Sequence, residues 1–342
     1  MIFAGTGVDR AQANAALIGL AELLGCPVIP SMAGRAVMPH DHPLYFHSQS
    51  PAADELRRNA DVMLVVGSRV GNLDVPFDKY WGDPAKCRVI HVDVDPRRIG
   101  ESRHVAIGMV ADARKALEGL AAKLRGRKLA SHGRADVAAQ RAVFGAWAKA
   151  IGDSVVAWQG PGIHPAQAIG AVGVVFGPGA VYCTDGGMTS LWAGLALPST
   201  QPNSYHGILE CGMLGTGIPS SIGAKLGAPA RDVVCVTGDG AAGFNAMEMQ
   251  VAAREGVKVT FVVMAEAEWT MEIPNEMTRW GKTFGTGMGE VRWDKVAEGL
   301  GCHGEYVDSI EALPAALVRA KAHAGPALVC VRTNKEANLA VP

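Results

Sequence analysis

The chain lacks the features by which several classes of protein are known from sequence. Lys and Arg number 32 against 33 Asp and Glu in 342 residues, so no basic excess exists to drive binding to nucleic acid. No apolar run reaches the length of a membrane span, and the apolar start of the chain lacks the features of a signal peptide. We therefore expect a cytoplasmic protein that binds neither nucleic acid nor a membrane.

Metal-binding cysteine motifs and hydrolase motifs are also missing. The seven cysteines include no Cys-x-x-Cys pair, and Cys183, Cys235 and Cys330 lie in strand-like runs. Buried free thiols in a reducing compartment explain this pattern better than disulfides or zinc ligands. The sequence has no Gly-x-Ser-x-Gly elbow, and its histidines lack the spacing of a metal site.

Strand-like and helix-like segments alternate along both halves of the chain. In the first half the strands are Ile2–Ala4, Cys26–Ile29, Val62–Val66 and Arg88–Val94, and the helices are Ala11–Leu24 and Ala52–Asn59. In the second half the strands are Ala180–Thr184, Val233–Thr237, Val257–Met264 and Ala327–Arg332, with a helix at Asn245–Glu255. Such alternation predicts the α/β class, with two doubly wound parallel-sheet domains in tandem.

A change of composition suggests where the domains divide. Between Leu124 and Arg141 the chain turns polar and basic, and a helix is expected around Val143–Ile151. The pair His164-Pro165 then has the form of a helix start. We predict a first domain over residues 1–130, a linker and helix over residues 131–155, and a second domain over residues 156–342.

The segment Val233–Val263 carries the strongest single signal for chemistry. Its first strand-like run ends in Gly238-Asp239-Gly240, and a helical stretch and a second strand-like run follow. Asp239 is therefore expected at the carboxyl end of a parallel strand, beside a glycine turn that opens a helix, where open α/β sheets bind phosphate and metal. Small residues let backbone N–H groups approach a diphosphate, and the carboxylate can hold Mg²⁺. A tight strand–helix turn without a ligand is the alternative.

Three further motifs accompany this turn, at Thr184–Gly187, Gly212–Pro219 and Trp269–Glu272. Together the four motifs resemble the diphosphate-binding domain of thiamine-diphosphate enzymes, within the group of acetolactate synthase, pyruvate decarboxylase and 2-hydroxyacyl-CoA lyase. Four ordered motifs are far more specific than any one of them. The first half of the chain resembles the middle domain of the same group, so the resemblance covers nearly all of the sequence.

The resemblance implies a metal site that grips the diphosphate of the cofactor through hard oxygen ligands. Its ligands would be Asp239, Glu266 and the main-chain carbonyl of Glu268. The chain departs from the family here, because Ala265-Glu266 replaces an Asn-Asn pair. Glutamate is one methylene longer than asparagine and adds negative charge, so Glu266 could bind Mg²⁺ directly or repel the diphosphate. We expect ligation; a surface acid at a strand end is the alternative.

The resemblance also implies which residues surround the cofactor. Leu214 would support its bent conformation, although an ordinary core leucine is the alternative. Glu272 matches the position of a glutamate that handles protons in decarboxylating relatives, although a solvated acid at a helix start is equally compatible. The implied cofactor-binding residues are Asp185, Gly186, Gly187, Met188, Gly212, Leu214, Gly238, Asp239, Gly240, Ala241, Ala242, Glu268, Trp269, Thr270 and Met271.

The family normally begins with another domain, which binds the aminopyrimidine and supplies the glutamate that activates the cofactor. Because Ile2–Ala4 already resembles the first strand of the middle domain, we expect a separate pyrimidine-binding chain, in a homo- or hetero-oligomer that acts on a 2-oxo acid. A truncated reading frame is an alternative.

Two other functions stay open. A non-catalytic relative would keep the fold and bind the cofactor without turnover. A nucleotide-binding protein would use Asp93 or Asp95, near the end of the strand-like run Val89–Val94, to hold a ribose. In the resembled family the middle domain sometimes carries FAD or ADP.

Overall fold

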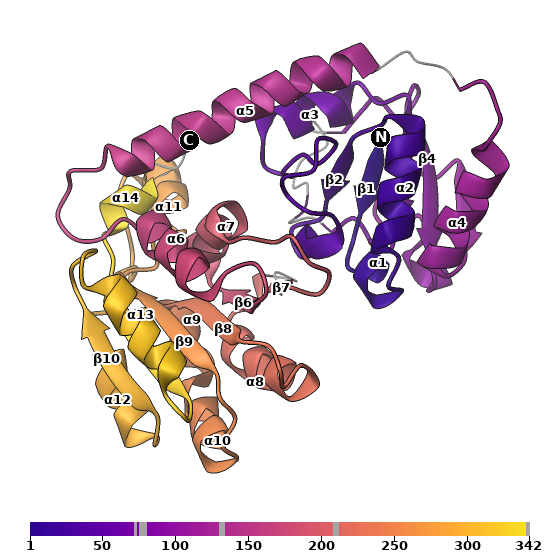
Figure 1. The fold of residues 1–342 in the computed structure, drawn as a ribbon. Helices are drawn as coiled ribbons and strands as arrows, with labels where there is room; N and C mark the ends of the chain where they lie inside the picture. The colour runs from indigo at the N-terminus through magenta and orange to yellow at the C-terminus, as the bar shows by residue number, and fades with distance from the viewer. Residues whose placement is uncertain (72–73, 75–80, 130–133, 208–211, 340–342) are drawn as a thin grey trace. The chain divides into compact units, whose positions relative to one another are not determined.

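Two sheets of parallel strands organise the chain, one in each of the two units into which it divides (Figure 1). This computed structural model describes residues 1–71, 74, 81–129, 134–207 and 212–339. Unit 1 comprises Met1–Ala150 and Ser199–Tyr205, and unit 2 comprises Ile151–Pro198 and His206–Pro342.

Unit 1 contains a five-stranded sheet of order β2-β1-β3-β4-β5. Its strands are β1 (Ile2–Ala4), β2 (Val28–Pro30), β3 (Val62–Val66), β4 (Arg88–Asp93) and β5 (Ile107–Val110). Its helices are α1 (Gly7–Arg10), α2 (Asn14–Leu24), η1 (Arg35–Val37), α3 (Pro51–Arg58), η3 (Pro96–Arg98) and α4 (Ala113–Leu124), followed by α5 (Arg134–Val156), which continues into unit 2. Leu17 of α2 and Leu117 of α4 are buried in one core with strand residues, whereas Ala53 of α3 is buried in another. Helices therefore cover both faces of the sheet.

Unit 2 contains a six-stranded sheet of order β10-β11-β9-β8-β6-β7. Its strands are β6 (Val181–Asp185), β7 (Tyr205–Gly207, whose first residue belongs to unit 1), β8 (Val233–Gly238), β9 (Thr260–Ala265), β10 (His303–Val307) and β11 (Ala327–Arg332). Its helices are α6 (Pro165–Phe176), α7 (Gly187–Ala196), α8 (Gly217–Gly227), α9 (Asp239–Asn245), η5 (Ala246–Glu248), α10 (Met249–Arg254), α11 (Ile273–Trp280), α12 (Trp293–Gly299), α13 (Leu313–Ala322) and α14 (Lys335–Leu339).

The core of unit 2 explains its helix arrangement. Cys235, Phe261 and Cys330, from three neighbouring strands, are fully buried with Ile222 of α8, Met249 of α10 and Ala297 of α12. The helix α6 packs against α7 and α13, and these two helices pack against the strands (Figure 1). Both sheets are thus doubly wound, and the α/β class with two parallel-sheet domains in tandem is confirmed.

The structure corrects two predicted helices. The helix expected at Asn245–Glu255 begins instead at Asp239 and runs as α9, η5 and α10, because the small residues after Asp239 continue directly into helical backbone. The helix expected at Val143–Ile151 is the longer α5, which takes in part of the polar stretch assigned to the linker. Val137 and Phe144 pack against the core of unit 1 and stabilise that extension. Residues 130–133 of the predicted linker lie outside the described residues.

Three strands that the sequence did not predict, β5, β7 and β10, all lie at sheet edges. An edge strand has a free side, so its residues need not form a continuous apolar run. In β5 Ile107 and Val110 are exposed, and in β10 all residues but Val307 are only partly buried. Their composition therefore carries a weak strand signal.

The sheet of unit 2 brings three acidic residues to one edge. Asp185 is the last residue of β6, Asp239 follows β8, and Glu266 follows β9. These strands are neighbours and run parallel, so their carboxyl ends meet at the same edge. That edge is where open α/β sheets bind their ligands.

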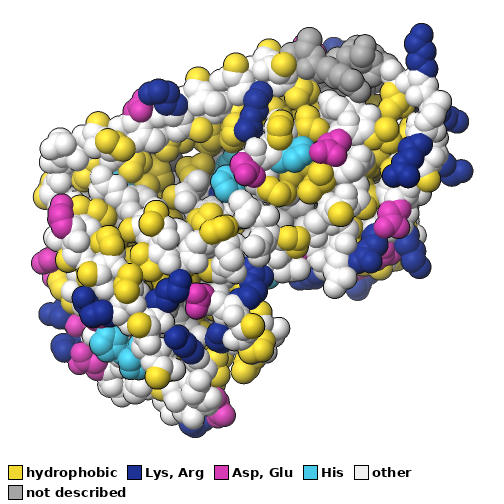
Figure 2. All heavy atoms as spheres, viewed as in Figure 1, with side chains coloured by type: hydrophobic (Ala, Val, Ile, Leu, Met, Phe, Trp, Pro, Cys, Tyr) yellow, Lys and Arg dark blue, Asp and Glu magenta, His cyan; other side chains and the backbone are white. Residues whose placement is uncertain are grey.

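The charged side chains on the surface agree with the nearly equal numbers of basic and acidic residues in the sequence. On the face drawn in Figure 2, Lys and Arg side chains are interspersed with Asp and Glu across much of the molecule. No helix of the described residues is both long and apolar enough to cross a membrane.

Burial predicts that two thiols of unit 2 are unreactive in the folded chain. Cys183 and Cys235 lie opposite each other across β6 and β8, and both are fully buried. Burial raises the pKa of Cys183 to about 12 and raises that of Cys235 well above its ordinary value. Iodoacetamide at pH 8 should leave both unmodified until urea unfolds the chain, as peptide mass spectrometry can show. Equal modification with and without urea would contradict the buried placement.

Candidate cofactor site

Asp185 ties the end of β6 to the start of α8. Its Oδ1 accepts a hydrogen bond from Gly186 N at 2.7 Å, and its Oδ2 accepts one from Gly217 N at 2.7 Å. A helix start has free N–H groups that need acceptors, and this buried carboxylate supplies one. Burial raises the pKa of Asp185, while backbone donors around Gly217 oppose the rise. Asp185 therefore holds the loop in place, a role that the motif alone did not indicate.

Asp239 joins the ends of β8 and β9. Its Oδ1 accepts a hydrogen bond from Gly240 N at 2.8 Å, and its Oδ2 accepts bonds from Glu266 N at 2.9 Å and Ala267 N at 2.6 Å. Burial raises its pKa, and these backbone donors act in the opposite direction. Asp239 therefore presents a carboxylate, a hard oxygen ligand of the kind that Mg²⁺ prefers, at the carboxyl end of β8.

The acidic loop after β9, residues 266–271, holds the other predicted ligands. The carboxylate of Glu266 accepts hydrogen bonds from Thr270 Oγ1 at 2.6 Å and from Thr333 Oγ1 at 3.4 Å. The carboxylate of Glu268 pairs with Lys335 Nζ at 2.6 Å. No backbone donor among the described residues is placed on the main-chain carbonyl of Glu268, which leaves this oxygen open to a cation.

Side chains of this loop cover both glycine turns. A Cβ atom at Gly240 would lie 2.4 Å from a ring carbon of Trp269, and one at Gly187 would lie 2.8 Å from Met271 Cβ. Such contacts leave no room for a side chain. Gly240 is thus required by the indole of Trp269, a packing role that sequence reasoning did not foresee.

Two buried hydroxyl groups of this region have no hydrogen-bond partner within the part of the chain that the structure describes. They are Ser190 Oγ in α7 and Thr216 Oγ1 immediately before α8. Leaving a buried donor unpaired costs about 1–3 kcal/mol. A diphosphate near these helix starts would offer acceptor oxygens, so the residues present fit such a group.

The predicted metal ligands differ in their contacts within the protein, and their role as ligands stays a prediction. Among the described residues the carboxylate of Asp239 accepts hydrogen bonds from the backbone, whereas the carboxylates of Glu266 and Glu268 have side-chain partners. The main-chain carbonyl of Glu268 is the third predicted ligand. Among the described residues no group of three or more His, Cys, Asp and Glu side chains is arranged to hold a metal ion. A hard cation also accepts phosphate oxygens and water, so two protein oxygens suffice to fit Mg²⁺ bound with a diphosphate.

The other predicted residues lie around this centre with different exposures. Ala241 and Ala242 are buried in α9, Gly238 lies against Thr189 of α7, and Met188 is partly buried. Leu214 is partly buried and lies shortly before α8. Two residues earlier, the backbone of Gly212 is in the left-handed region, with φ 64°. Glu272 is exposed at the start of α11, as in the solvated alternative. The catalytic roles of Leu214 and Glu272 stay predictions.

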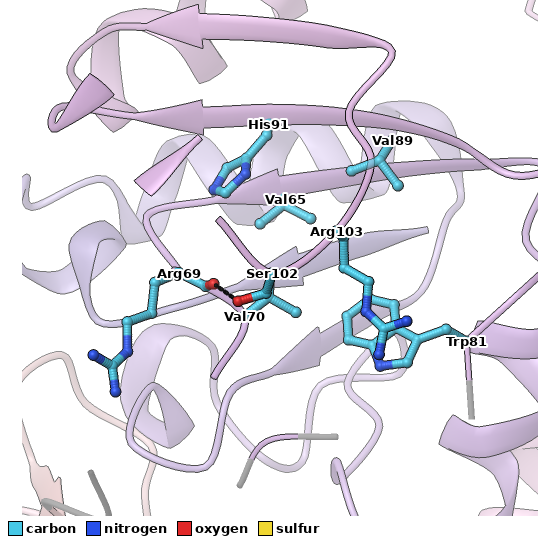
Figure 3. Close-up of a pocket in the computed structure, with 8 residues that line it drawn as sticks. All are labelled: Val65, Arg69, Val70, Trp81, Val89, His91, Ser102 and Arg103. Atoms are coloured by element: carbon cyan, nitrogen blue, oxygen red, sulfur yellow. Dashed lines mark hydrogen bonds between the residues drawn. The ribbon is translucent and has the colours of Figure 1, made fainter. Parts of the chain in front are cut away.

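The acids suggested for a nucleotide in unit 1 have local partners. Asp93 Oδ1 accepts a hydrogen bond from Asp95 N, and Arg97 pairs with Asp95 and lowers the pKa of that carboxyl to about 2. A nearby pocket, where Arg103 lies over Trp81 and His91 is buried, has a volume of about 10 Å³ (Figure 3). This is room for one water molecule and not for a nucleotide.

Two descriptions of known protein families match the chain, and one of them covers the cofactor edge of unit 2. The description "Thiamine pyrophosphate enzyme, C-terminal TPP binding domain" matches residues 185–331, from Asp185 to the last strand. The description "Thiamine pyrophosphate enzyme, central domain" matches residues 1–120. The chain belongs to the thiamine pyrophosphate enzyme family. Thiamine diphosphate is accordingly the cofactor that its C-terminal domain indicates.

Individual relatives are longer than this chain. It is similar to a sulfoacetaldehyde acetyltransferase from Castellaniella defragrans, 30% identical over 94% of this chain and 57% of that protein. An acetolactate synthase large subunit from Corynebacterium glutamicum is 26% identical over 94% of this chain and 52% of that protein. The chain therefore spans little more than half the length of these curated relatives.

A solved structure shares the fold. The thiamine diphosphate-dependent 4-hydroxybenzoylformate decarboxylase of Rhodococcus jostii RHA1 aligns with a TM-score of 0.79 at 24% identity. The alignment covers 98% of this chain and 61% of that one. At this identity the likeness establishes the fold alone.

Sequence reasoning missed Thr333 and Lys335, which contact the acidic loop. Both follow the last strand, and neither belongs to a motif. The pairing of Arg332 with Ala265 between β11 and β9 brings Thr333 next to Glu266. The register of β11 against β9 is what identifies Thr333 and Lys335 as neighbours of the acidic loop. Register is a property of the folded sheet and is not visible in the sequence.

The contacts of Asp185 predict a structural cost for its removal. Asp185→Ala should lower the free energy of unfolding by about 1–3 kcal/mol, because Gly217 N–H would lose its buried acceptor. Urea denaturation followed by circular dichroism measures this change. Asp308→Ala, at an exposed position after β10, is the matched control and should have almost no effect. Equal stability of the two variants would contradict the capping role.

Proposed function

We propose that unit 2 binds the diphosphate end of thiamine diphosphate together with Mg²⁺, as part of an acetolactate-synthase-like enzyme. The observation that carries the proposal is the buried carboxylate of Asp239, which accepts hydrogen bonds from three backbone N–H groups at the carboxyl edge of the sheet. The main-chain carbonyl of Glu268 lies in the same loop that Asp239 binds. Both are hard oxygens of the kind that Mg²⁺ prefers.

The diphosphate would lie at the starts of α7 and α8. Backbone N–H groups at a helix start attract anions, and Ser190 and Thr216 add unpartnered hydroxyl groups there. Gly186 has φ 93°, which brings backbone without a side chain to this edge. When bound, thiamine diphosphate supplies a carbanion-stabilising centre for carbon–carbon bond cleavage or formation. The residues of this chain hold and orient that group.

The reaction that we propose is decarboxylation or carboligation of a 2-oxo acid. Support comes from the names of the relatives, which include an acetolactate synthase, a sulfoacetaldehyde acetyltransferase and a decarboxylase. A non-catalytic relative that only binds the cofactor is the alternative, and the departure at Glu266 is the observation that favours it. Turnover separates the two.

We further propose that a pyrimidine-binding domain from outside these 342 residues completes the site, within an oligomer. Phe244 is 62% exposed and Met247 is 69% exposed, although both side chains are apolar. Phe244 packs against Gly215, next to Leu214, so this apolar area adjoins the predicted thiazolium side. Exposed apolar area beside a site is typical of a docking surface. The six free cysteines of the described residues support a reducing, cytoplasmic location.

The metal assignment predicts a specific loss of binding. Asp239→Ala should abolish Mg²⁺-dependent binding of thiamine diphosphate, because it removes the carboxylate that the proposal assigns to the cation at the end of β8. Asp93→Ala, in unit 1, should bind as the unaltered chain does. Isothermal titration with and without Mg²⁺ measures both. Equal loss in the two variants, or binding that needs no metal, would sink the assignment.

The partner proposal predicts low activity for the chain alone. Cofactor activation requires an acid within hydrogen-bond reach of the aminopyrimidine, and Glu272 is expected on the thiazolium side. Adding a pyrimidine-binding chain should therefore raise decarboxylation or carboligation of a 2-oxo acid such as pyruvate by orders of magnitude. The measurement is product formation, with exchange of the cofactor C2 proton as a second readout. Substantial exchange or turnover by the chain alone would refute the need for a partner.

A further inference from the structure

We propose that unit 1 has a binding site of its own for a small carboxylate, built from the guanidinium of Arg35 and the phenol of Tyr45. Arg35 is 4% exposed and Tyr45 is 1% exposed. In the part of the chain that the structure describes, Nε and Nη1 of Arg35 and the hydroxyl of Tyr45 have no hydrogen-bond partner. The inference goes beyond the proposed function and does not depend on it, because the residues that carry it belong to unit 1.

The backbone around Arg35 is held by contacts on both sides. Arg35 begins η1, shortly after the end of β2, and Gly34 N donates to Ser31 Oγ at 2.9 Å in the turn before it. On the other side, Asn14 Nδ2 donates to Val37 O at 3.0 Å. Val37 is itself fully buried in a core of unit 1. The backbone therefore keeps Arg35 inside the unit, near the carboxyl end of β2.

The buried guanidinium carries a positive charge that lacks an ion-pair partner among the described residues. It lies over the ring of Tyr205, with 5.5 Å between the guanidinium carbon and the ring centroid. A ring face attracts a cation, but it does not accept the N–H groups at the edge of the guanidinium plane. Burying an unpaired charge costs much free energy, so a native fold that keeps one there needs a reason. An anionic ligand supplies that reason.

The hydroxyl of Tyr45 belongs to the same place. Tyr45 pairs with Val28 of β2, and Phe46 N donates to Val28 O at 3.0 Å beside it. Burial raises the pKa of Tyr45, and the charge of Arg35 acts in the opposite direction, so the guanidinium is near this phenol. The phenol stays protonated and offers its hydrogen. Because a buried tyrosine hydroxyl normally has a partner, Tyr45 is a second unsatisfied donor of the site.

The donors select the class of ligand. Guanidinium nitrogens and a protonated phenol both donate, so the ligand must bring acceptor oxygens. A guanidinium binds a carboxylate through parallel N–H···O bonds, and its single charge balances that of one carboxylate. Phosphate carries more charge and favours a helix N-terminus, which the three residues of η1 are too few to provide. Nη2 of Arg35 is not among the fully covered atoms, so a small ligand can reach the guanidinium from that side.

The test measures how sodium acetate stabilises the whole chain, at an ionic strength kept constant with sodium chloride and without thiamine diphosphate or Mg²⁺. A ligand that binds only the folded chain raises the midpoint of thermal unfolding, and the dependence on concentration gives the dissociation constant. Arg35→Met should weaken acetate binding by about tenfold or more, because it removes a charged donor. Tyr45→Phe removes only the hydroxyl and should weaken binding by about two- to tenfold.

The same variants separate a binding role from a structural one. Without acetate, Arg35→Met should unfold at a higher temperature than the unaltered chain, because an apolar side chain replaces an unpaired buried charge. Arg97→Met is the matched control in unit 1, where the side chain is 84% exposed, and it should change neither the acetate affinity nor the midpoint. Tyr45→Phe keeps the test decisive if Arg35→Met fails to fold.

The outcomes decide for or against the site. Loss of the acetate effect in Arg35→Met, with a reduced effect in Tyr45→Phe, supports it. No acetate effect on the unaltered chain, or an equal effect in all variants, overturns it. Stabilisation by sodium phosphate but not by acetate overturns the carboxylate assignment. A lower midpoint for Arg35→Met without acetate, with Tyr45→Phe stabilised as fully as the unaltered chain, also overturns the inference, since Arg35 would then serve the fold through Tyr205.

Discussion

The carboxylate of Asp239 links the two strand ends on which the rest of the site is built. One oxygen binds the backbone at the start of α9, and the other binds two successive backbone N–H groups after β9. Ala267 takes φ 61° here, a strained value for a residue with a side chain, and the paired bonds to Asp239 help to hold it. Trp269 then packs over Gly240 and closes the same junction with apolar contact. The loop and the helix start are therefore set relative to each other before any ligand binds.

Each acid at this edge has a different partner, and the partners decide what it can do. Asp185 binds the backbone of α8, Glu268 pairs with a lysine, and Glu266 is bound by two hydroxyl groups. Like charges placed close together would otherwise disfavour ionisation. Separate partners let these four acids share one end of a sheet, with Asp185 and Asp239 bound by backbone donors and Glu266 and Glu268 by side chains.

The sequence predicted the strands that are buried in the sheets and the acids that follow them. Ile2–Ala4, Val62–Val66 and Ala327–Arg332 have the predicted bounds, because buried parallel strands are continuous apolar runs. It did not predict β5, β7 and β10, three edge strands whose residues are partly exposed, although it did predict β2, a buried edge strand. It also placed a helix start at Asn245, whereas α9 begins at Asp239, since a short glycine- and alanine-rich helix carries little apolar periodicity.

The sequence by itself determined that Asp185, Asp239 and Glu266 lie at the carboxyl ends of strands, because an apolar run followed by an acid is a local pattern. Only the tertiary structure decided which groups contact these acids. Gly217 is 32 residues from Asp185, and Thr333 is 67 residues from Glu266. Such distant contacts depend on the order and register of the strands. Local sequence does not encode them, because register is set by the packing of the whole sheet.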